Sequence, residues 1–325
     1  MLSTGACLRK HRPRHPTTVR CPRMKHVRAN GIDVAYLEQG TGPLVLLLHG
    51  FPDNAGTWNR QLPALAAAGY RAVAPNLRGY PPSGIPAEGF YDRATLAEDV
   101  AELIRQLGGG QRAHLIGQDW GAAIAYGVLA AFPELIDRAI VMAVPHPAIV
   151  ANSVLDARHV HHSFHWFFFQ LPGLPEQALA ANDFAFIDYL WRHWSAPGHE
   201  DATHIADIKR MLAEPGALTA TLSYYRAMFD PSKADSRLET LRQSMTRPIS
   251  VPTLALCGSV DPRAEQMRDQ AQHFTGEYRF ELVPGAGHFL HREQPADVNR
   301  LILDWLAPRN RAHPLGPGPR QSPLQ

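Results

Sequence analysis

The residues whose types and spacing could do chemistry are clearest at positions 117–122, where the sequence is GQDWGA. A glycine, any residue, a nucleophile, any residue and a second glycine is the spacing of a nucleophile elbow, where a strand turns sharply into a helix. Glycines are expected there because a Cβ at either position would crowd the turn. The nucleophile is Asp119. A carboxylate attacks amides and esters poorly, but it can displace a group at a saturated carbon and leave an alkyl ester. An ordinary strand–loop–helix junction is the alternative interpretation.

Two further residues have the types that would assist this carboxylate. An elbow nucleophile needs a base, a group that orients the base, and hydrogen-bond donors for an oxyanion. Asp261 follows the apolar run 252–257, and His288 follows the strand-like run 278–283. Nucleophile, acid and histidine in this order are typical of triads built on an elbow. Asp261 precedes Pro262 and would also suit a helix cap, but the three residues together, each after a strand, predict a catalytic triad.

The segment 49–52, with the sequence HGFP, is the candidate source of oxyanion donors. It leaves the apolar run 44–48 directly, so it can aim the backbone N–H of Phe51 at the nucleophile. The N–H of Trp120, at the start of the elbow helix, would be the second donor. An ordinary Gly-Pro turn is the alternative interpretation of this segment.

The elements that must position these residues alternate between strands and helices. Continuous apolar runs, which are typical of strands covered on both faces, occupy residues 44–48, 139–144 and 252–257. Thr95 with Glu98 resembles a capping box at the start of a helix that continues to about Leu107. The alternation predicts an α/β fold with a mostly parallel central sheet and helices on both faces. In such sheets the functional residues gather at the carboxyl ends of the strands.

We expect one α/β domain with a helical insertion. The middle of the chain lacks clear strand runs and carries many aromatic residues, histidines and scattered prolines, whereas both termini are rich in Arg and Pro and are typical of disorder. The expected stretches are a disordered basic leader over 1–24, the first part of the core over 25–147, a helical lid over 148–247, the second part of the core over 248–307, and a disordered tail over 308–325. Met24 is an alternative to Met1 as the initiator.

Composition argues against several classes of protein. The net charge of +2 conceals eight Lys or Arg in residues 1–30 and three Arg in residues 308–325, which leave the middle at about −9. This argues against a nucleic-acid surface on the folded body. No apolar run reaches transmembrane length, and the leader lacks the apolar stretch of a secretory signal, so we expect no membrane partner. Three cysteines make no disulfide framework, which favours a reducing cytoplasm.

Four motifs together resemble those of the α/β-hydrolase-fold epoxide hydrolases. They lie at residues 49–52, 117–122, 258–262 and 287–288. The resemblance extends over roughly residues 26–306, nearly all of the chain expected to be ordered. It implies that Asp119 attacks an epoxide carbon, and that His288, oriented by Asp261, activates the water that hydrolyses the resulting ester.

The resemblance also implies an acid in the lid, usually two tyrosines, because an opened epoxide is an alkoxide that needs a proton or a hydrogen bond. Residues 222–228 resemble the segment that carries the second tyrosine, and Tyr225 fits its place better than Tyr224. Helical spacing alone would make Tyr225 a core residue. In residues 162–173 the place of the first tyrosine holds His165, and a histidine–tyrosine pair resembles the arrangement in a smaller bacterial subgroup. Titration of His165 near neutrality would add a pH dependence.

Two other interpretations remain open, a haloalkane dehalogenase and a non-catalytic binding protein, whereas a fluoroacetate dehalogenase is disfavoured. A haloalkane dehalogenase would use the same aspartate, with Trp120 and a lid tryptophan such as Trp166 as halide donors. A fluoroacetate dehalogenase would hold its substrate with arginines beside the nucleophile, and residues 120–123 offer none. A non-catalytic protein would keep the fold as a ligand pocket. The presence of Tyr225 and His165 distinguishes an epoxide hydrolase from a dehalogenase, because epoxide opening needs these hydrogen-bond donors and halide departure does not.

The expected partners are a small apolar epoxide and water, bound in a pocket lined by Phe51, Trp120 and Trp166. The histidines at 159–165 have no Cys or carboxylate set beside them, so we expect no metal. No cofactor is expected either. The sequence leaves open which epoxide is used, and its regio- and enantioselectivity. The oligomeric state is also open, a homodimer being one option.

Overall fold

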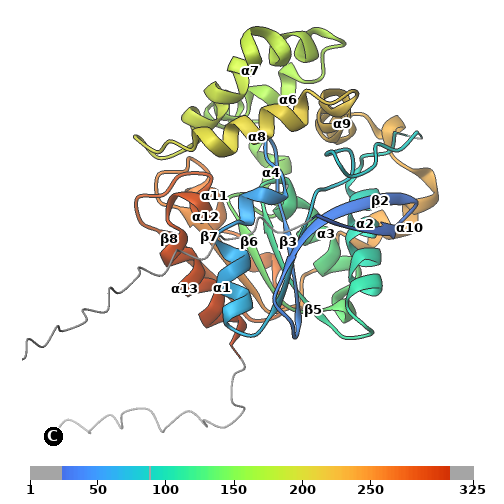
Figure 1. Ribbon diagram of the computed structural model, residues 1–325, viewed down its shortest axis with the longest axis vertical. Helices are drawn as coiled ribbons and strands as arrows, with labels where there is room; N and C mark the ends of the chain where they lie inside the picture. Colours follow the sequence, from blue (N-terminus) through green and yellow to red (C-terminus); the bar gives the residue numbers. More distant parts are fainter. Residues whose placement is uncertain (1–23, 88, 308–325) are drawn as a thin grey trace, which may run out of the picture.

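The computed structural model describes residues 24–87 and 89–307. The tail expected over 308–325, and the leader expected over 1–24 apart from Met24, lie outside the described residues. Within the described part, the centre of the molecule is one eight-stranded sheet (Figure 1). No helix in this part is long and apolar enough to cross a membrane.

The sheet is mostly parallel, as the sequence predicts. Its order is β1-β2-β4-β3-β5-β6-β7-β8, with β2 antiparallel to both β1 and β4 and every later pairing parallel. The strands are β1 Lys25–Ala29, β2 Ile32–Gln39, β3 Leu44–Leu48, β4 Arg71–Pro75, β5 Ala113–Gln118, β6 Ile136–Met142, β7 Thr253–Gly258 and β8 Tyr278–Val283. Gly117 of β5 is in register with Leu48 of β3 and Val141 of β6, so the ends of these strands meet at one edge.

Helices cover both faces of the sheet, which explains the continuous apolar strands. In β3, Leu44, Leu46 and Leu48 belong to one core cluster, and Val45 and Leu47 belong to the other. The first cluster lies under α2 and α3, and the second lies under α1 and α13. The helices of the α/β body are α1 Gln61–Ala67, α2 Arg93–Leu107, α3 Trp120–Ala131, α11 Ala264–Arg268, α12 Leu290–Glu293 and α13 Pro295–Leu306.

The start of α2 differs from the expected capping box. The helix begins at Arg93, and its N-cap is Asp92, whose carboxylate accepts hydrogen bonds from the Ala94 N–H and the Thr95 hydroxyl. The prediction that Thr95 caps the helix is therefore wrong. An aspartate earlier in the chain already satisfies the free N–H groups of the first turn.

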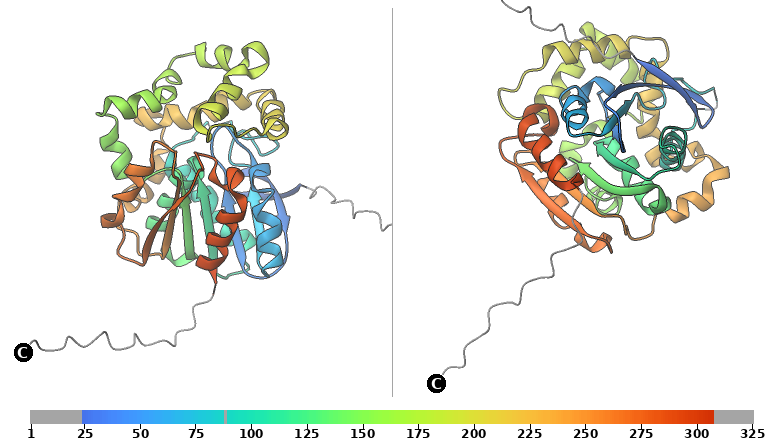
Figure 2. Two further views of the ribbon diagram at one scale, coloured as in Figure 1. Left: turned by 90° about the vertical axis from the view of Figure 1, so that its left-hand side faces the viewer. Right: turned by 60° about the horizontal axis from the view of Figure 1, so that its bottom comes forward.

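A layer of helices lies between β6 and β7 in the chain and covers the carboxyl ends of the strands (Figures 1 and 2). These helices are α4 Pro147–Ser153, α5 Ala157–His162, α6 Phe164–Phe168, α7 Leu174–Trp194, α8 Ala202–Leu212 and α9 Ala217–Phe229. The helix α10 Glu239–Ser244, from the end of the same segment, instead packs beside α2 and α3 on one face of the sheet (Figure 1). The Trp191 indole donates to the Pro52 carbonyl at 3.0 Å, and His204 Nε2 lies 2.7 Å from Asp53 Oδ1. Both contacts tie this layer to the loop after β3, which carries the HGFP motif.

Candidate active site

The sharp turn predicted at the GQDWGA motif is present between β5 and α3. Asp119 has φ 52° and ψ −120°, an uncommon conformation for a residue with a side chain. A Cβ on Gly117 would meet the carbonyl group of Gly121, and a Cβ on Gly121 would meet that of Leu48. A Cβ on Gly50 would meet the Asp119 side chain itself. These glycines therefore let the carboxylate stand alone at the bend, against the loop after β3.

Asp261 and His288 lie beside Asp119, each from a loop that follows a strand. His288 Nε2 is 3.3 Å from Asp119 Oδ2, and His288 Nδ1 is 3.0 Å from Asp261 Oδ2. All three side chains are buried. The second oxygen of Asp261 accepts a hydrogen bond from the Arg263 N–H at 2.8 Å. The interpretation of Asp261 as a helix cap is wrong, because the N-cap of α11 is Arg263 and no described side chain caps this helix. One oxygen of Asp261 instead holds the turn before α11, and the other contacts the histidine.

Opposing effects set the charges of this cluster. Burial disfavours ionised Asp119, but hydrogen bonds from His288 and from the N–H groups of Phe51 and Trp120 lower its pKa. Burial likewise acts against ionised Asp261, and the hydrogen bond and charge of His288 prevail and lower its pKa. Burial disfavours protonated His288, but its hydrogen bonds to both carboxylates raise its pKa to about 9. The resting cluster therefore holds two carboxylates and one imidazolium, and Asp119 is ionised.

The two backbone donors expected for an oxyanion both face the Asp119 carboxylate. The Phe51 N–H donates to Asp119 Oδ1 at 2.8 Å, and the Trp120 N–H also hydrogen-bonds to this carboxylate. His49 holds the loop in place, since its Nε2 accepts from the Leu77 N–H at 3.0 Å. If Asp119 forms an ester, its carbonyl oxygen already lies at the position where these donors can stabilise a negative charge.

Tyr225, from α9, is buried above the nucleophile. Its ring packs edge to face on Phe51, Trp120 and Phe169, with centroid distances of 5.4, 5.2 and 5.1 Å. Burial, with a smaller contribution from the charge of Asp119, raises the pKa of Tyr225 well above its ordinary value. The phenol therefore stays protonated and can donate. The neighbouring hydroxyl of Tyr224 instead donates to the Arg78 carbonyl at 2.7 Å, which occupies it structurally.

His165, from α6, lies next to Tyr225 with a ring-centroid distance of 5.5 Å. It is buried, and its Nδ1 has no hydrogen-bond partner among the described residues. Burial, followed by the positive charge of Arg263, lowers the pKa of His165 well below its ordinary value. The expectation that this residue titrates near neutrality is therefore wrong. His165 is a neutral imidazole, which can donate one hydrogen bond.

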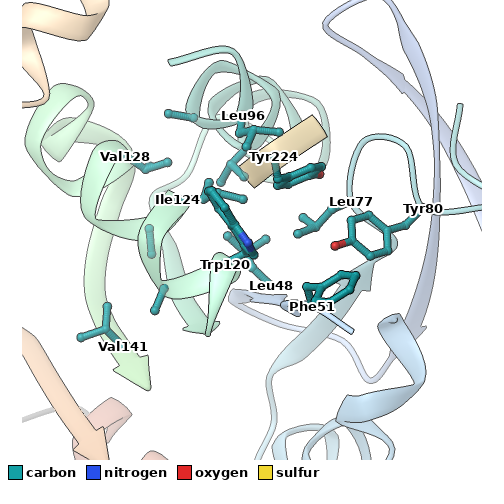
Figure 3. Packing of buried hydrophobic residues seen from close by; sticks show 14 of the residues in the cluster. Leu48, Phe51, Leu77, Tyr80, Leu96, Trp120, Ile124, Val128, Val141 and Tyr224 are labelled. Atoms are coloured by element: carbon teal, nitrogen blue, oxygen red, sulfur yellow. The ribbon is translucent and has the colours of Figure 1, made fainter. Parts of the chain in front are cut away.

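A cavity of about 310 Å³ lies over the nucleophile and is lined by both Asp119 and Tyr225. Most of its wall is apolar and includes Trp120, Val144, Val150, Trp166, Met228 and Phe229. Trp120 and Trp166 thus lie where the sequence places substrate-binding residues. Phe51 is absent from the described residues that line this cavity, because its ring is fully buried against Phe169. Figure 3 shows this ring beside Tyr80, with Trp120 among Leu48, Leu77 and Ile124.

Sequence reasoning missed two arginines that line this cavity, Arg93 and Arg263. Arg263 is buried, and one of its guanidinium nitrogens lies 3.4 Å from the Ser163 hydroxyl of the helical layer. The position of Arg263, two residues after Asp261, could have predicted its place at the site, since the loop that carries Asp261 was already expected there. Arg93 carries no such signal, because it comes from the start of α2. No group of three or more His, Cys, Asp or Glu that could hold a metal occurs in residues 24–87 and 89–307.

The chain is similar to known hydrolases in sequence and in fold. Residues 43–295 match the family described as alpha/beta hydrolase fold. Epoxide hydrolase 3 of Xenopus tropicalis is 34% identical over 301 residues, which cover 86% of this chain and 76% of the relative. A fluoroacetate dehalogenase of Burkholderia sp is 29% identical over 277 residues, covering 82% of this chain and 88% of the relative. The crystal structure of epoxide hydrolase A from Mycobacterium thermoresistibile superposes with a TM-score of 0.75 at 27% identity, covering 88% of this chain and 98% of that one.

Proposed function

The chain belongs to the α/β-hydrolase-fold family, and on this premise we propose that it is an epoxide hydrolase that forms a vicinal diol through an ester on Asp119. The observation that carries the proposal is the shared cavity: an ionised Asp119 and a protonated Tyr225 line the same mainly apolar space. One can attack an epoxide carbon while the other meets the epoxide oxygen. The helices α4 to α9 act as the lid over this space.

In the first step, an Asp119 oxygen attacks a ring carbon and the carbon–oxygen bond of the epoxide breaks. The leaving oxygen stays attached to the substrate through its other carbon and needs a proton. Tyr225 supplies it, and neutral His165 donates a second hydrogen bond to the same oxygen. His165 is not among the described residues that line the cavity, but it contacts Tyr225, and its buried Nδ1 has no hydrogen-bond partner among the described residues. In the tautomer that carries its proton on Nδ1, a hydrogen bond to the ligand would satisfy this nitrogen.

In the second step, His288 removes a proton from water, and the oxygen of that water attacks the ester carbon of Asp119. The N–H groups of Phe51 and Trp120 stabilise the oxyanion that forms on the ester carbonyl. Esterification removes the charge of Asp119, so the pKa of His288 falls from about 9, and the proton that His288 releases restores Tyr225 before His288 acts as the base. Collapse of the oxyanion breaks the bond to the diol oxygen, which takes the proton that His288 removed from water. The second proton of that water passes from Asp119 back to His288 and restores the carboxylate and the imidazolium.

A dehalogenase is the second candidate, and Arg93 and Arg263 favour it. No arginine occurs beside the elbow in the sequence, yet these two guanidinium groups line the cavity and could hold a small carboxylate. Tyr225 and His165 weigh against this candidate, because a halide leaves as a stable anion and needs no proton. We also propose a cytoplasmic location, which the free thiol of the buried Cys257 supports.

The test uses His288→Gln with styrene oxide and intact-protein mass spectrometry. The variant should accumulate protein heavier by one substrate molecule, located on Asp119 by peptide mapping, while wild type forms diol. Asp119→Asn is the matched control and should give no adduct. Halide release from bromobutane or fluoroacetate, with no diol from a panel of epoxides, would replace this proposal with the dehalogenase. Neither product from either panel would favour a non-catalytic binding protein.

A further inference from the structure

A second cavity, of about 230 Å³, lies between the lid and the loop after β7. His162 and His193 form part of its lid side. On the side of the α/β body it is lined by Val260, Asp261, Arg263 and His288. Val260 is 50% exposed, and His193 is also exposed, so this cavity opens to solvent.

The two cavities divide the catalytic residues between them. Among the described lining residues, Asp119 occurs only in the apolar cavity, and His288 and Asp261 occur only in the second one. Arg263 lines both and forms part of the wall between them. The wall of the first cavity is mainly apolar, whereas most residues of the second carry polar side chains. The nucleophile thus faces a space suited to the epoxide, and the base faces a space suited to water.

The proposed two-step reaction would benefit from separate cavities for the substrate and for the hydrolytic water. After the first step the alkyl ester fills the apolar cavity, so water that had to pass through that cavity would be blocked by the intermediate it must attack. A separate space that reaches His288 from another side, with charged and imidazole side chains in its wall, avoids the conflict. Ordered water in such a site needs several polar partners, and the histidines, Asp261 and Arg263 provide them.

We propose that the second cavity is the access route for the hydrolytic water, which reaches His288 between Val260 and His193 while the ester occupies the first cavity. The inference rests on the proposed function. It adds no chemical step: the water that enters here gives one proton to His288 and its oxygen to the ester carbon of Asp119. The cavity therefore controls the rate of ester hydrolysis and leaves the rate of alkylation unchanged.

The test compares Val260→Trp with Val260→Ala at the same position. Single-turnover experiments with excess enzyme, stopped in acid and followed by mass spectrometry, give separate rates for ester formation and ester hydrolysis. Val260→Trp should slow hydrolysis on the order of tenfold, which corresponds to about 1.4 kcal/mol, and should raise the fraction of alkylated enzyme in the steady state. Its rate of alkylation should match wild type, which also shows that the site is folded. Val260→Ala should behave as wild type in both steps.

A second variant, His193→Trp, narrows the same opening from the lid and should give the same pattern. If Val260→Trp loses alkylation, that variant is misfolded, and His193→Trp then provides the test of the water route. Normal hydrolysis in a variant that alkylates normally would overturn the water route. Failure of the proposed function looks different: no ester would form on Asp119 in wild type or in His288→Gln, and there would be no second step to slow.

Discussion

Replacing Tyr225 by phenylalanine tests the lid acid, because the change removes one hydroxyl and leaves the ring in place. The ring contacts with Phe51, Trp120 and Phe169, at centroid distances of 5.1 to 5.4 Å, do not involve the hydroxyl. The variant should therefore fold. Burial keeps the phenol protonated in wild type, so the full donor is lost on substitution. One positioned acid contributes about 10²-fold or more, which corresponds to about 2.7 kcal/mol on the barrier to ring opening.

The assay is the rate of ester formation on Asp119 with excess enzyme and styrene oxide, stopped in acid and measured by mass spectrometry. Tyr224→Phe is the matched control from the next position of α9. Its hydroxyl donates to the buried Arg78 carbonyl, so this variant should lose about 1–3 kcal/mol of stability in urea and keep the rate of ring opening. An unchanged rate in Tyr225→Phe, or equal slowing in both variants, would refute the role of Tyr225.

Three further predictions concern charges and donors. His165→Phe should slow ring opening by about tenfold, and the rate in wild type should show no titration of His165 near pH 6.5, because burial keeps its pKa well below that value. The pKa of His288 is raised to about 9 in the folded protein, so its stabilising contribution is fully present below about pH 6.5 and is lost as the pH rises through about 9. Urea denaturation should show the free energy of unfolding falling over that range in wild type and much less in His288→Gln. Asp53→Asn removes the carboxylate that His204 contacts at 2.7 Å, and should lower the free energy of unfolding in urea by about 1–3 kcal/mol.

The features that the sequence predicted well are those that depend on local spacing. The elbow is one, because Gly117 and Gly121 are required by contacts within a few residues or with the adjacent strand. The meeting of the catalytic residues is another, because each follows a strand and parallel strands bring their carboxyl ends to one edge. The helix start at Arg93 was misplaced, although it is local, because two residues capable of capping lie three positions apart and either pattern fits the sequence.

The features that sequence could not predict arise where distant segments meet. The low pKa of His165 follows from its burial on the inner side of the lid helix α6 and from Arg263, which lies nearly a hundred residues away in the chain. The burial of the Phe51 ring depends on Phe169 of the lid. The division of the catalytic residues between two cavities depends on how the helical layer sits on the sheet, and no periodicity in the sequence encodes it.

The most direct test of a nucleophilic Asp119 is one turnover in water enriched in heavy oxygen, with enzyme in excess over epoxide. If the ester forms, the oxygen added to the diol comes from the Asp119 carboxylate, so the first product should be unlabelled and the label should appear in Asp119. Diol that carries the label after a single turnover, with an unlabelled Asp119, would mean that water attacks the epoxide directly and would contradict the mechanism.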